Sequence, residues 1–272
     1  MTATITIRNL HKSFPSREIP GGYTSILKGV SLDVQAGEFI CILGSSGCGK
    51  STLLNILAAL DPHYDGELLI DGKAPGTPGI KVGYLFQEDR LLPWRTAEEN
   101  IDFALAAAGA PKSVWKERKE KYFSIAGLSE YRKLYPHQLS GGMRQRLSLV
   151  RALAIEPDLL LMDEPFSSLD EMTARRLRMD ILEIWRATKR TIVFVTHNSY
   201  EASFLADRVV IMAGGVVHEA ISVNLPRPRD YDGQALFDMN RQVIARFIAS
   251  SVTASGTSPL VAVAGSSPNR PK

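Results

Sequence analysis

Short runs of almost purely apolar residues alternate along the chain with amphipathic, more polar stretches. The clearest runs are residues 38–43, 159–163 and 191–195, and strands that are buried on both faces of a parallel sheet have this pattern. The segment 170–187 lies between the last two runs and has the spacing of a helix, which gives a strand–helix–strand unit. The pattern therefore predicts the α/β fold class with a parallel sheet at its centre.

Further elements are expected on either side of these runs. Strands are predicted at 4–8, at 30–43 with a turn at Gly37, at 68–70, at 82–86, and in a hairpin of 209–212 and 216–217 around Gly214 and Gly215. Helices are predicted at 51–59, at 96–108, at 112–126 and from Ser140 to about Ile155.

The order of these elements predicts one interrupted domain over residues 1–250. Its α/β core would comprise about 1–90 and 157–222, a helical subdomain would be inserted at about 91–156, and a helical segment would follow at about 230–250. Residues 251–272 are rich in Ser, Pro, Ala and Gly and contain no acidic residue, so a disordered tail is expected there.

Composition excludes several classes of protein. The 272 residues are 44% hydrophobic and 22% charged, and a net charge of +3 gives no electrostatic footprint for nucleic acid. No signal peptide is evident at the start, and no run approaches the roughly 18 apolar residues that span a bilayer. We therefore expect a protein of the reducing cytosol, with two unpaired cysteines, that reaches a membrane only through another chain.

One glycine-rich segment directly follows the first buried run. Gly44–Ser51 matches the pattern Gly-x4-Gly-Lys-Ser of a phosphate-binding loop, and a helix is predicted directly after it. The glycines let main-chain N–H groups surround a polyphosphate, to which the helix presents its positive end. This indicates a P-loop NTPase core, with Lys50 on the β- and γ-phosphates and Ser51 on Mg²⁺.

Two acidic residues end the buried run at 159–163. Asp163 and Glu164 would lie at the carboxyl edge of the sheet, where ligands bind in α/β folds. Asp163 is suited to holding Mg²⁺, and Glu164 to orienting an attacking water. Taken alone, the pair could also be a solvated turn.

Three further polar positions are candidates at the ends of elements. Ser140, Gly141 and Gly142 begin a predicted helix with a bare backbone, which favours a second anion site or simply a capped helix start. His197 follows a predicted strand and could contact the γ-phosphate, although a structural role is favoured for a lone histidine. Gln87 directly follows another predicted strand, where a merely structural polar residue is also favoured.

With these five motifs in this order, the chain resembles the ATP-binding subunits of ABC transporters over roughly residues 5–250. The resemblance implies an ABC-type ATPase core with an inserted helical subdomain and a small antiparallel β region, and ATP and Mg²⁺ as ligands. It assigns the adenine contact to Phe14, or less strongly to Tyr23, and the phosphate contacts to Gly44, Ser45, Ser46, Gly47, Cys48, Gly49, Lys50, Ser51 and Thr52. Ser51, Gln87 and Asp163 would hold the metal, and Glu164, His197 and Gln87 would be catalytic.

The same resemblance implies that one chain holds only part of each site. Ser140, Gly141 and Gly142 would close on ATP that is bound to a second subunit, and the loop Ser168–Asp170 would cross to that subunit. A head-to-tail pair with two ATP molecules follows, symmetric if it is a homodimer. Asn198 departs from the family pattern, which often has an acid there, and we expect a modest effect.

Three segments narrow the resemblance to importers of nitrate, taurine and aliphatic sulfonates. These are Leu91–Trp94, Met162–Phe166 and Val223–Arg229. Leu91, Leu92 and Trp94 would form an apolar surface for a helix of a membrane permease, or else belong to the core. An importer of this kind works at the cytoplasmic face of the membrane with a permease, near Gln87–Trp94, and an extracytoplasmic solute-binding protein.

The alternative is a soluble ABC ATPase of an assembly pathway, such as iron–sulfur cluster assembly. The Leu91–Trp94 and Val223–Arg229 segments argue against it, but length does not exclude it. A nucleotide switch without turnover is disfavoured by Glu164 and His197, and an exporter by the lack of fused spanning helices.

Overall fold

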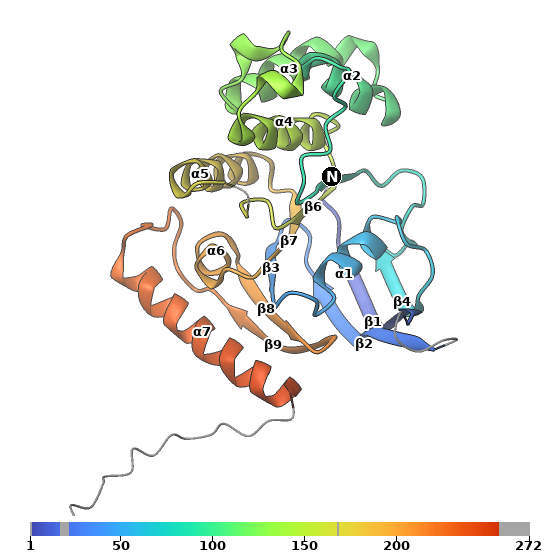
Figure 1. Ribbon diagram of the computed structural model, residues 1–272, viewed down its shortest axis with the longest axis vertical. Helices are drawn as coiled ribbons and strands as arrows, with labels where there is room; N and C mark the ends of the chain where they lie inside the picture. The colour runs from blue at the N-terminus through green and yellow to red at the C-terminus, as the bar shows by residue number, and fades with distance from the viewer. Residues whose placement is uncertain (1, 17–21, 168, 256–272) are drawn as a thin grey trace, which may run out of the picture.

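The computed structural model describes residues 2–16, 22–167 and 169–255, and Figure 1 shows the arrangement of its elements. A six-stranded sheet lies in the lower body in the order β5-β6-β7-β3-β8-β9. Its strands are β5 (Val82–Leu85), β6 (Leu159–Asp163), β7 (Thr191–Thr196), β3 (Phe39–Leu43), β8 (Arg208–Ala213) and β9 (Val216–Ser222). All neighbours from β5 to β8 are parallel, and β9 pairs antiparallel with β8, as the glycine-centred hairpin predicts.

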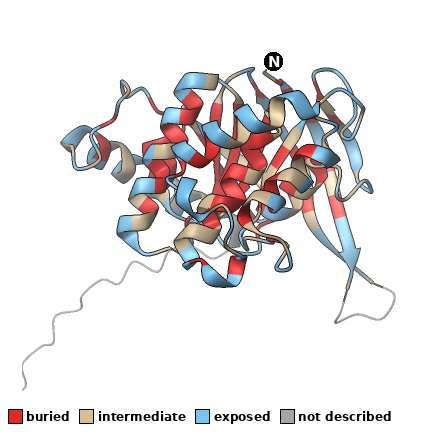
Figure 2. Cartoon of the chain, turned by 90° about the horizontal axis from the view of Figure 1, so that it is seen from above, coloured by how far each residue is buried: buried red, intermediate tan, exposed pale blue. Residues whose placement is uncertain are grey.

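The central strands are buried on both faces, which explains their unbroken apolar sequences. In β3, Phe39, Cys41 and Leu43 pack into one hydrophobic cluster, whereas Ile40 and Ile42 pack into the other. Burial of one such large side chain stabilises the fold by about 1.5–3 kcal/mol. Figure 2 shows the buried residues gathered in the middle of the molecule, with exposed residues toward its outside.

A second, antiparallel sheet of three strands packs beside the first, in the order β2-β1-β4. Its strands are β1 (Ile5–Pro15), β2 (Tyr23–Val34) and β4 (Asp65–Ile70). The strand expected at 4–8 is longer than predicted, because β1 continues through a bulge at Asn9, whose φ is +49. The bulge breaks the apolar alternation that the sequence prediction followed.

Three helices form the upper body in Figure 1, above the sheets. They are α2 (Ala97–Ala107), α3 (Lys112–Ile125) and α4 (Gly141–Ala154), and they lie within the stretch where an inserted helical subdomain was expected. A capping box fixes the start of α2, because Thr96 accepts from the Glu99 N–H while the Glu99 carboxylate accepts from the Thr96 N–H.

The other helices accompany the parallel sheet. They are α1 (Lys50–Leu57), α5 (Glu171–Thr188), α6 (Ser199–Leu205) and α7 (Gln234–Ser255). The short helix α6 was not predicted. It begins at Asn198, whose Oδ1 accepts hydrogen bonds from the N–H groups of Tyr200 (2.9 Å) and Glu201 (3.2 Å).

The last helix extends into the segment for which a disordered tail was expected. Helix α7 contacts α6 and β8 and continues to Ser255, beyond the expected boundary at residue 250. Within this extension, the Ser251 hydroxyl donates to the Phe247 carbonyl one turn earlier (2.9 Å). Residues 256–272 lie outside the described residues. Within residues 2–16, 22–167 and 169–255, no helix has both the length and the apolar character to cross a bilayer.

Candidate active site

The phosphate loop lies between β3 and α1, and its shape requires glycine at two positions. Gly49 precedes α1 with φ +103, and a Cβ there would lie 2.7 Å from the Leu27 Cδ2 atom. A Cβ at Gly44 would lie 2.5 Å from both the Cys48 sulfur and the Met212 carbonyl oxygen. No described side chain caps the start of α1. Its first N–H groups are therefore available to an anion in the loop.

Lys50 is the first residue of α1, and its ammonium group lies inside the loop. Nζ donates hydrogen bonds to the carbonyls of Gly44 (2.9 Å) and Ser45 (3.0 Å), and it lies 3.6 Å from Glu164 Oε1. Lys50 is 4% exposed, so these oxygens replace the hydration that its charge has lost. The cation is thus held where the loop meets the end of β6.

Two of the three residues predicted to hold the metal, Ser51 and Asp163, touch each other. Ser51 Oγ donates a hydrogen bond to Asp163 Oδ1 at 3.0 Å. Burial raises the pKa of the Asp163 carboxyl above its usual value, the charge of Glu164 adds to this, and the Ser51 hydrogen bond opposes it. A cation at this point would stabilise the ionised form, because it would replace the hydration that burial removes.

Glu164 joins the ends of β6 and β7 to the loop. It has a φ of +43, which is unusual for a residue other than glycine, and its N–H donates to the Val195 carbonyl in β7 (3.0 Å). Oε2 lies 2.9 Å from His197 Nδ1, whereas Oε1 faces Lys50. The sequence places Glu164 after a strand but gives no signal of this left-handed conformation.

Lys50, Ser51 and Glu164 border an open cleft of about 400 Å³. Phe14 from β1 and Gln87 after β5 line it together with Glu164 and residues of the loop. Tyr23, the weaker adenine candidate, is 72% exposed and is not among the described residues that line the cleft. The geometry thus favours Phe14, which the sequence had left paired with Tyr23.

The start of α4 is separate from this cleft. Ser140 caps the helix and its Oγ accepts from the Met143 N–H (3.3 Å), while a Cβ at Gly142 would lie 2.7 Å from Thr173 Cγ2 of α5. Asp170 caps α5, and the hydrogen bonds from Thr173 lower its pKa. The structure therefore brings the start of α4 to the start of α5, but not to the phosphate loop of the same chain. Ser168 lies outside the described residues.

Two arginines of α4 bind the segment after Gln87, a link that sequence analysis missed. Arg144 Nε donates to Asp89 Oδ2 (2.9 Å), and Arg151 donates to the carbonyls of Asp89 (2.9 Å) and Arg90 (2.7 Å). The helical spacing of the two arginines was visible, but nothing in the sequence identified their partners. Through these bonds the position of α4 depends on the segment that follows Gln87.

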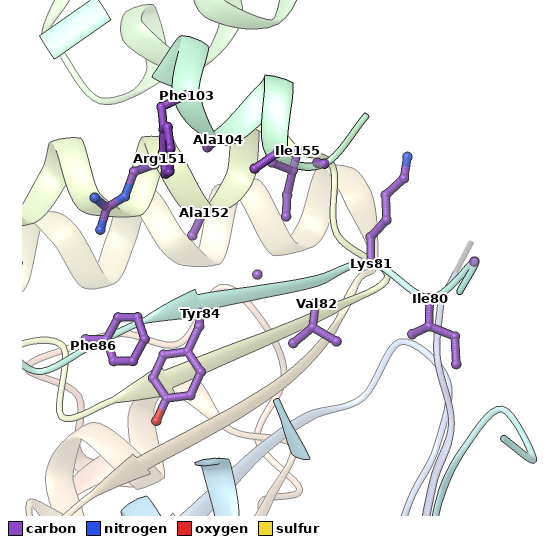
Figure 3. A pocket seen from close by; sticks show the side chains of 14 residues that line it. Ile80, Lys81, Val82, Tyr84, Phe86, Phe103, Ala104, Arg151, Ala152 and Ile155 are labelled. Atoms are coloured by element: carbon purple, nitrogen blue, oxygen red, sulfur yellow. The ribbon is translucent and has the colours of Figure 1, made fainter. Parts of the chain in front are cut away.

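A groove of about 580 Å³ lies between β5 and the helices α2 and α4. Figure 3 shows Phe103, Ala104, Ala152 and Ile155 on the helix side of this groove, whereas the Val82 and Tyr84 side chains extend from β5 away from these helices. The rings of Tyr84 and Phe86 stack at 4.0 Å. The residues that line the groove are mainly apolar, and those from β5 and Phe86 directly precede Gln87 in the sequence.

The apolar surface expected from Leu91, Leu92 and Trp94 is not one surface. Leu91 is buried in the large hydrophobic cluster, Leu92 is half-buried, and Trp94 is 71% exposed. The Leu92 N–H and carbonyl are both bound by Asn100 of α2, which turns this loop back onto the helix. The groove beside Gln87 is therefore lined by residues that sequence analysis did not select.

The segment Val223–Arg229 is packed rather than free. The Arg229 guanidinium is buried and donates to the carbonyls of Ser203 (3.0 Å), Phe204 (2.8 Å) and Ala206 (2.7 Å) at the end of α6. These are the carbonyls that a helix end leaves unsatisfied. The segment thus fixes the C-terminal part of the chain to α6.

Comparison with known proteins gives a consistent result. The protein-family model described as "ABC transporter" matches residues 27–167. The aliphatic sulfonates import ATP-binding protein SsuB of Bacillus subtilis is 39% identical over 249 residues, which are 91% of this chain and 94% of that protein. The bicarbonate transport ATP-binding protein CmpD of Synechocystis sp. is 42% identical over 236 residues, 85% of this chain and 83% of that protein.

Two solved structures of the cassette MJ0796 are also similar. Each aligns with a TM-score of 0.72 over 82% of this chain and all of that chain, at 30% and 29% identity. Both are described as dimeric, and one is a post-hydrolysis state bound to ADP and Pi.

Proposed function

The chain belongs to the ABC transporter family as an ATP-binding subunit, and from this premise we propose that it is the ATP-hydrolysing subunit of an importer. It powers the uptake of a small anion, such as nitrate, taurine or an aliphatic sulfonate, through a separate membrane permease. The observation that carries the proposal is the contact of Glu164 with both His197 and Lys50 beside the phosphate loop. The relatives named for sulfonate and bicarbonate support the solute class.

ATP binds in the cleft with its phosphates at the uncapped start of α1. Main-chain N–H groups of the loop bind the phosphate oxygens, Lys50 exchanges its carbonyl partners for the β- and γ-phosphates, and Phe14 stacks on adenine. These interactions fix the γ-phosphate beside Glu164, so positioning and charge supply most of the catalysis.

The donors at the loop fit a magnesium ion. Ser51 Oγ and Asp163 Oδ1 are both oxygens, which Mg²⁺ prefers, and Gln87 lines the same cleft. Among the described residues, no group of three or more His, Cys, Asp or Glu side chains is placed to hold a metal. That suits Mg²⁺, which is usually held by few protein ligands together with substrate phosphates. When bound, the ion would neutralise charge on the phosphates.

Glu164 acts as the base for the attacking water. Its carboxylate accepts a proton from water at the γ-phosphate, while His197, 2.9 Å away, holds that carboxylate in place. The left-handed backbone of Glu164 directs the side chain toward the cleft rather than along the sheet. Hydrolysis then separates ADP from phosphate.

Two chains complete each site. Ser140, Gly141 and Gly142 are not among the described residues that line the nucleotide cleft, and Gly142 packs against Thr173, whose N–H binds Asp170 at the start of α5. In a head-to-tail dimer this surface closes on ATP bound to the partner subunit. Loss of phosphate opens the dimer again.

The groove beside Gln87 is the docking site of the permease. Its apolar lining from β5, α2 and α4 suits a short helix of a partner (Figure 3). Arg144 and Arg151 connect the Gln87 segment to α4, so closure of the dimer moves both walls of the groove. The chain therefore works peripherally at the cytoplasmic face of the membrane, with an extracytoplasmic solute-binding protein completing the importer.

Purification from native membranes tests this proposal. A tagged Glu164→Gln form, isolated in mild detergent with ATP, is expected to bring a multi-spanning permease in near-equal amount. Lys50→Ala, which weakens ATP binding, serves as the matched control for nucleotide-dependent association. Recovery of soluble scaffold proteins and no permease would overturn the importer role in favour of an assembly ATPase.

A further inference from the structure

A buried ionic network lies beside Glu164 and His197, outside the nucleotide cleft. Its centre is Arg178 of α5, which is 2% exposed. Nη1 lies 2.9 Å from Glu171 Oε1 and 2.6 Å from the Tyr231 hydroxyl, and Nη2 lies 3.0 Å from Glu201 Oε1. One guanidinium thus joins the start of α5, the segment before α7, and α6, which are distant in sequence (Figure 1).

One branch of the network ends at the two residues that flank His197 in the sequence. Glu201 accepts a hydrogen bond from Thr196 Oγ1 (2.7 Å), and Thr196 Oγ1 accepts from the Asn198 N–H (3.0 Å). Thr196 and Asn198 are the two neighbours of His197 in the turn between β7 and α6. The position of the His197 backbone is therefore set through Glu201 by Arg178.

The other branch ends at the loop that leads into α5. Glu171 accepts from Arg178 and from the Tyr231 hydroxyl (2.7 Å), and it directly follows Asp170, the cap of α5. Asp170 is the residue proposed above to reach the partner subunit. Arg178 consequently connects the loop at the subunit interface with the turn that bears His197.

A polar cavity of about 190 Å³ lies among these segments. Its lining includes Glu164, His197, Arg178, Glu171 and Glu201. A cavity of this size and polarity holds water rather than packed side chains. The Arg178–Glu201 pair therefore connects α5 directly to α6 beside a water-filled space.

A gain in stability does not by itself explain the buried Arg178–Glu201 pair. Burial of two charges costs hydration, and an apolar pair of similar volume is often as stable. A guanidinium, however, fixes two carboxylates in defined directions through its planar fork. The arrangement therefore favours control of geometry over a gain in stability.

We propose that Arg178 is a positioning residue for ATP hydrolysis: it holds the turn with His197 and the interface loop with Asp170 in one fixed relation. Closure of the partner on Asp170 is then transmitted through Glu171, Arg178 and Glu201 to the imidazole that orients Glu164. This inference rests on the proposed roles of Glu164, His197 and Asp170.

Steady-state kinetics of three variants test the proposal in the full-length protein. Arg178→Gln is expected to lower kcat about tenfold with little change in KM for ATP, because the bound nucleotide does not touch Arg178. Arg178→Lys retains the charge but not the fork and should recover part of kcat. Glu171→Gln removes only the interface branch, and its side chain is 66% exposed, so that variant should fold even if Arg178→Gln does not.

Arg246→Gln is the matched control. Arg246 lies on α7, outside the network, and pairs with Glu219 of β9 at 2.9 Å, and its side chain is well exposed. Its kcat should stay within about twofold of the wild-type value, as expected of an exposed pair. If folded Arg178→Lys and Glu171→Gln match this control, the proposal is wrong and the network is only structural.

Nuclear magnetic resonance of the imidazole groups separates this inference from the proposed function. In protein with ¹⁵N-labelled histidine, Arg178→Gln should move the ring signals of His197 and leave those of the other four histidines unchanged. This readout needs no hydrolysis. Unmoved His197 signals would overturn the positioning role even in an active ATPase, whereas moved signals in a protein without ATPase activity would retain it and count against the catalytic assignment.

Discussion

The starts of helices α1 and α4 are built from similar parts and differ in how they are completed. The first follows a glycine-rich turn, the second begins with two glycines, and both present main-chain N–H groups. At α1 no described side chain caps the helix, and Lys50, Ser51 and the carboxylates at the end of β6 lie around it. At α4, Ser140 caps the helix, and Gly142 packs against Thr173 of α5.

The difference shows that the start of α1 is a nearly complete anion-binding site, whereas the start of α4 is half of one. An anion at α1 meets a cation, metal-binding oxygens and a candidate base in the same chain. An anion at α4 would meet N–H groups, one hydroxyl and the Arg144 guanidinium beside Gly141, but no counterpart of the metal-binding oxygens and base at α1, so its other contacts must come from elsewhere. A chain with both surfaces is suited to pairing head to tail with a second copy.

The largest effect is expected from a substitution that removes the proposed catalytic base beside α1 and leaves ATP binding intact. Glu164→Gln keeps the size of the side chain but loses the base, so kcat should fall roughly 100-fold or more. ATP affinity, measured by equilibrium titration, should be unchanged or tighter. Near-normal hydrolysis by this variant would remove Glu164 from the mechanism.

A smaller effect is expected at α4. In Gly142→Ala the new Cβ would lie 2.7 Å from Thr173 Cγ2, which would push the start of α4 away from α5. We expect kcat to fall about tenfold while ATP affinity stays constant, because a displacement near 1 Å disrupts catalytic geometry. Thr173→Ser removes the clashing methyl group, and failure of this second change to restore activity would rule out the steric explanation.

The contact that links α4 to the segment after Gln87 is expected to affect ATP hydrolysis less than either helix start does. Arg144→Gln breaks the 2.9 Å contact with Asp89 and should lower kcat about threefold by loosening the Gln87 segment from α4. Arg8→Gln, in an exposed pair with Asp33 on the antiparallel sheet, is the control for loss of a surface ion pair. Equal effects of the two variants on kcat would argue against a specific link.

The smallest effect is expected at Cys48 in the loop. In the proposed mechanism the loop binds phosphate through main-chain N–H groups, so Cys48→Ser should keep kcat within about twofold of wild type. Burial raises the pKa of the Cys48 thiol, so the thiolate forms only at alkaline pH and alkylation should accelerate as pH rises. Rapid alkylation at pH 7 would show that the loop is more open than the structure indicates.

The sequence predicted the α1 region well because its determinants are local. The loop, its strand and its helix are contiguous, and Asp163, Glu164 and His197 each follow an apolar run that must be a buried strand. Parallel strands bring such ends together at one edge of the sheet. No comparable local signal predicts that Arg178 meets Glu201, or that Arg144 meets Asp89.

The features that could not be predicted from the sequence depend on contacts between distant segments. Leu91 and Trp94 have similar apolar character, yet one is buried and the other exposed, because Asn100 turns their loop onto α2. The groove beside Gln87 is formed by residues from three elements, and α7 extends to Ser255 where composition favoured disorder. Such outcomes depend on packing that a single sequence does not display.

A mixed dimer tests the central claim, that each site is built from two chains, most directly. One subunit carries Lys50→Ala and the other Ser140→Arg, with different tags so that only the mixed dimer is purified. Each variant alone breaks both sites, whereas the mixed dimer collects both defects in one site and leaves the other intact. We predict about half of the wild-type ATPase activity per dimer, on the assumption that the two sites are independent. Activity no higher than that of the two parent variants would contradict the two-chain site.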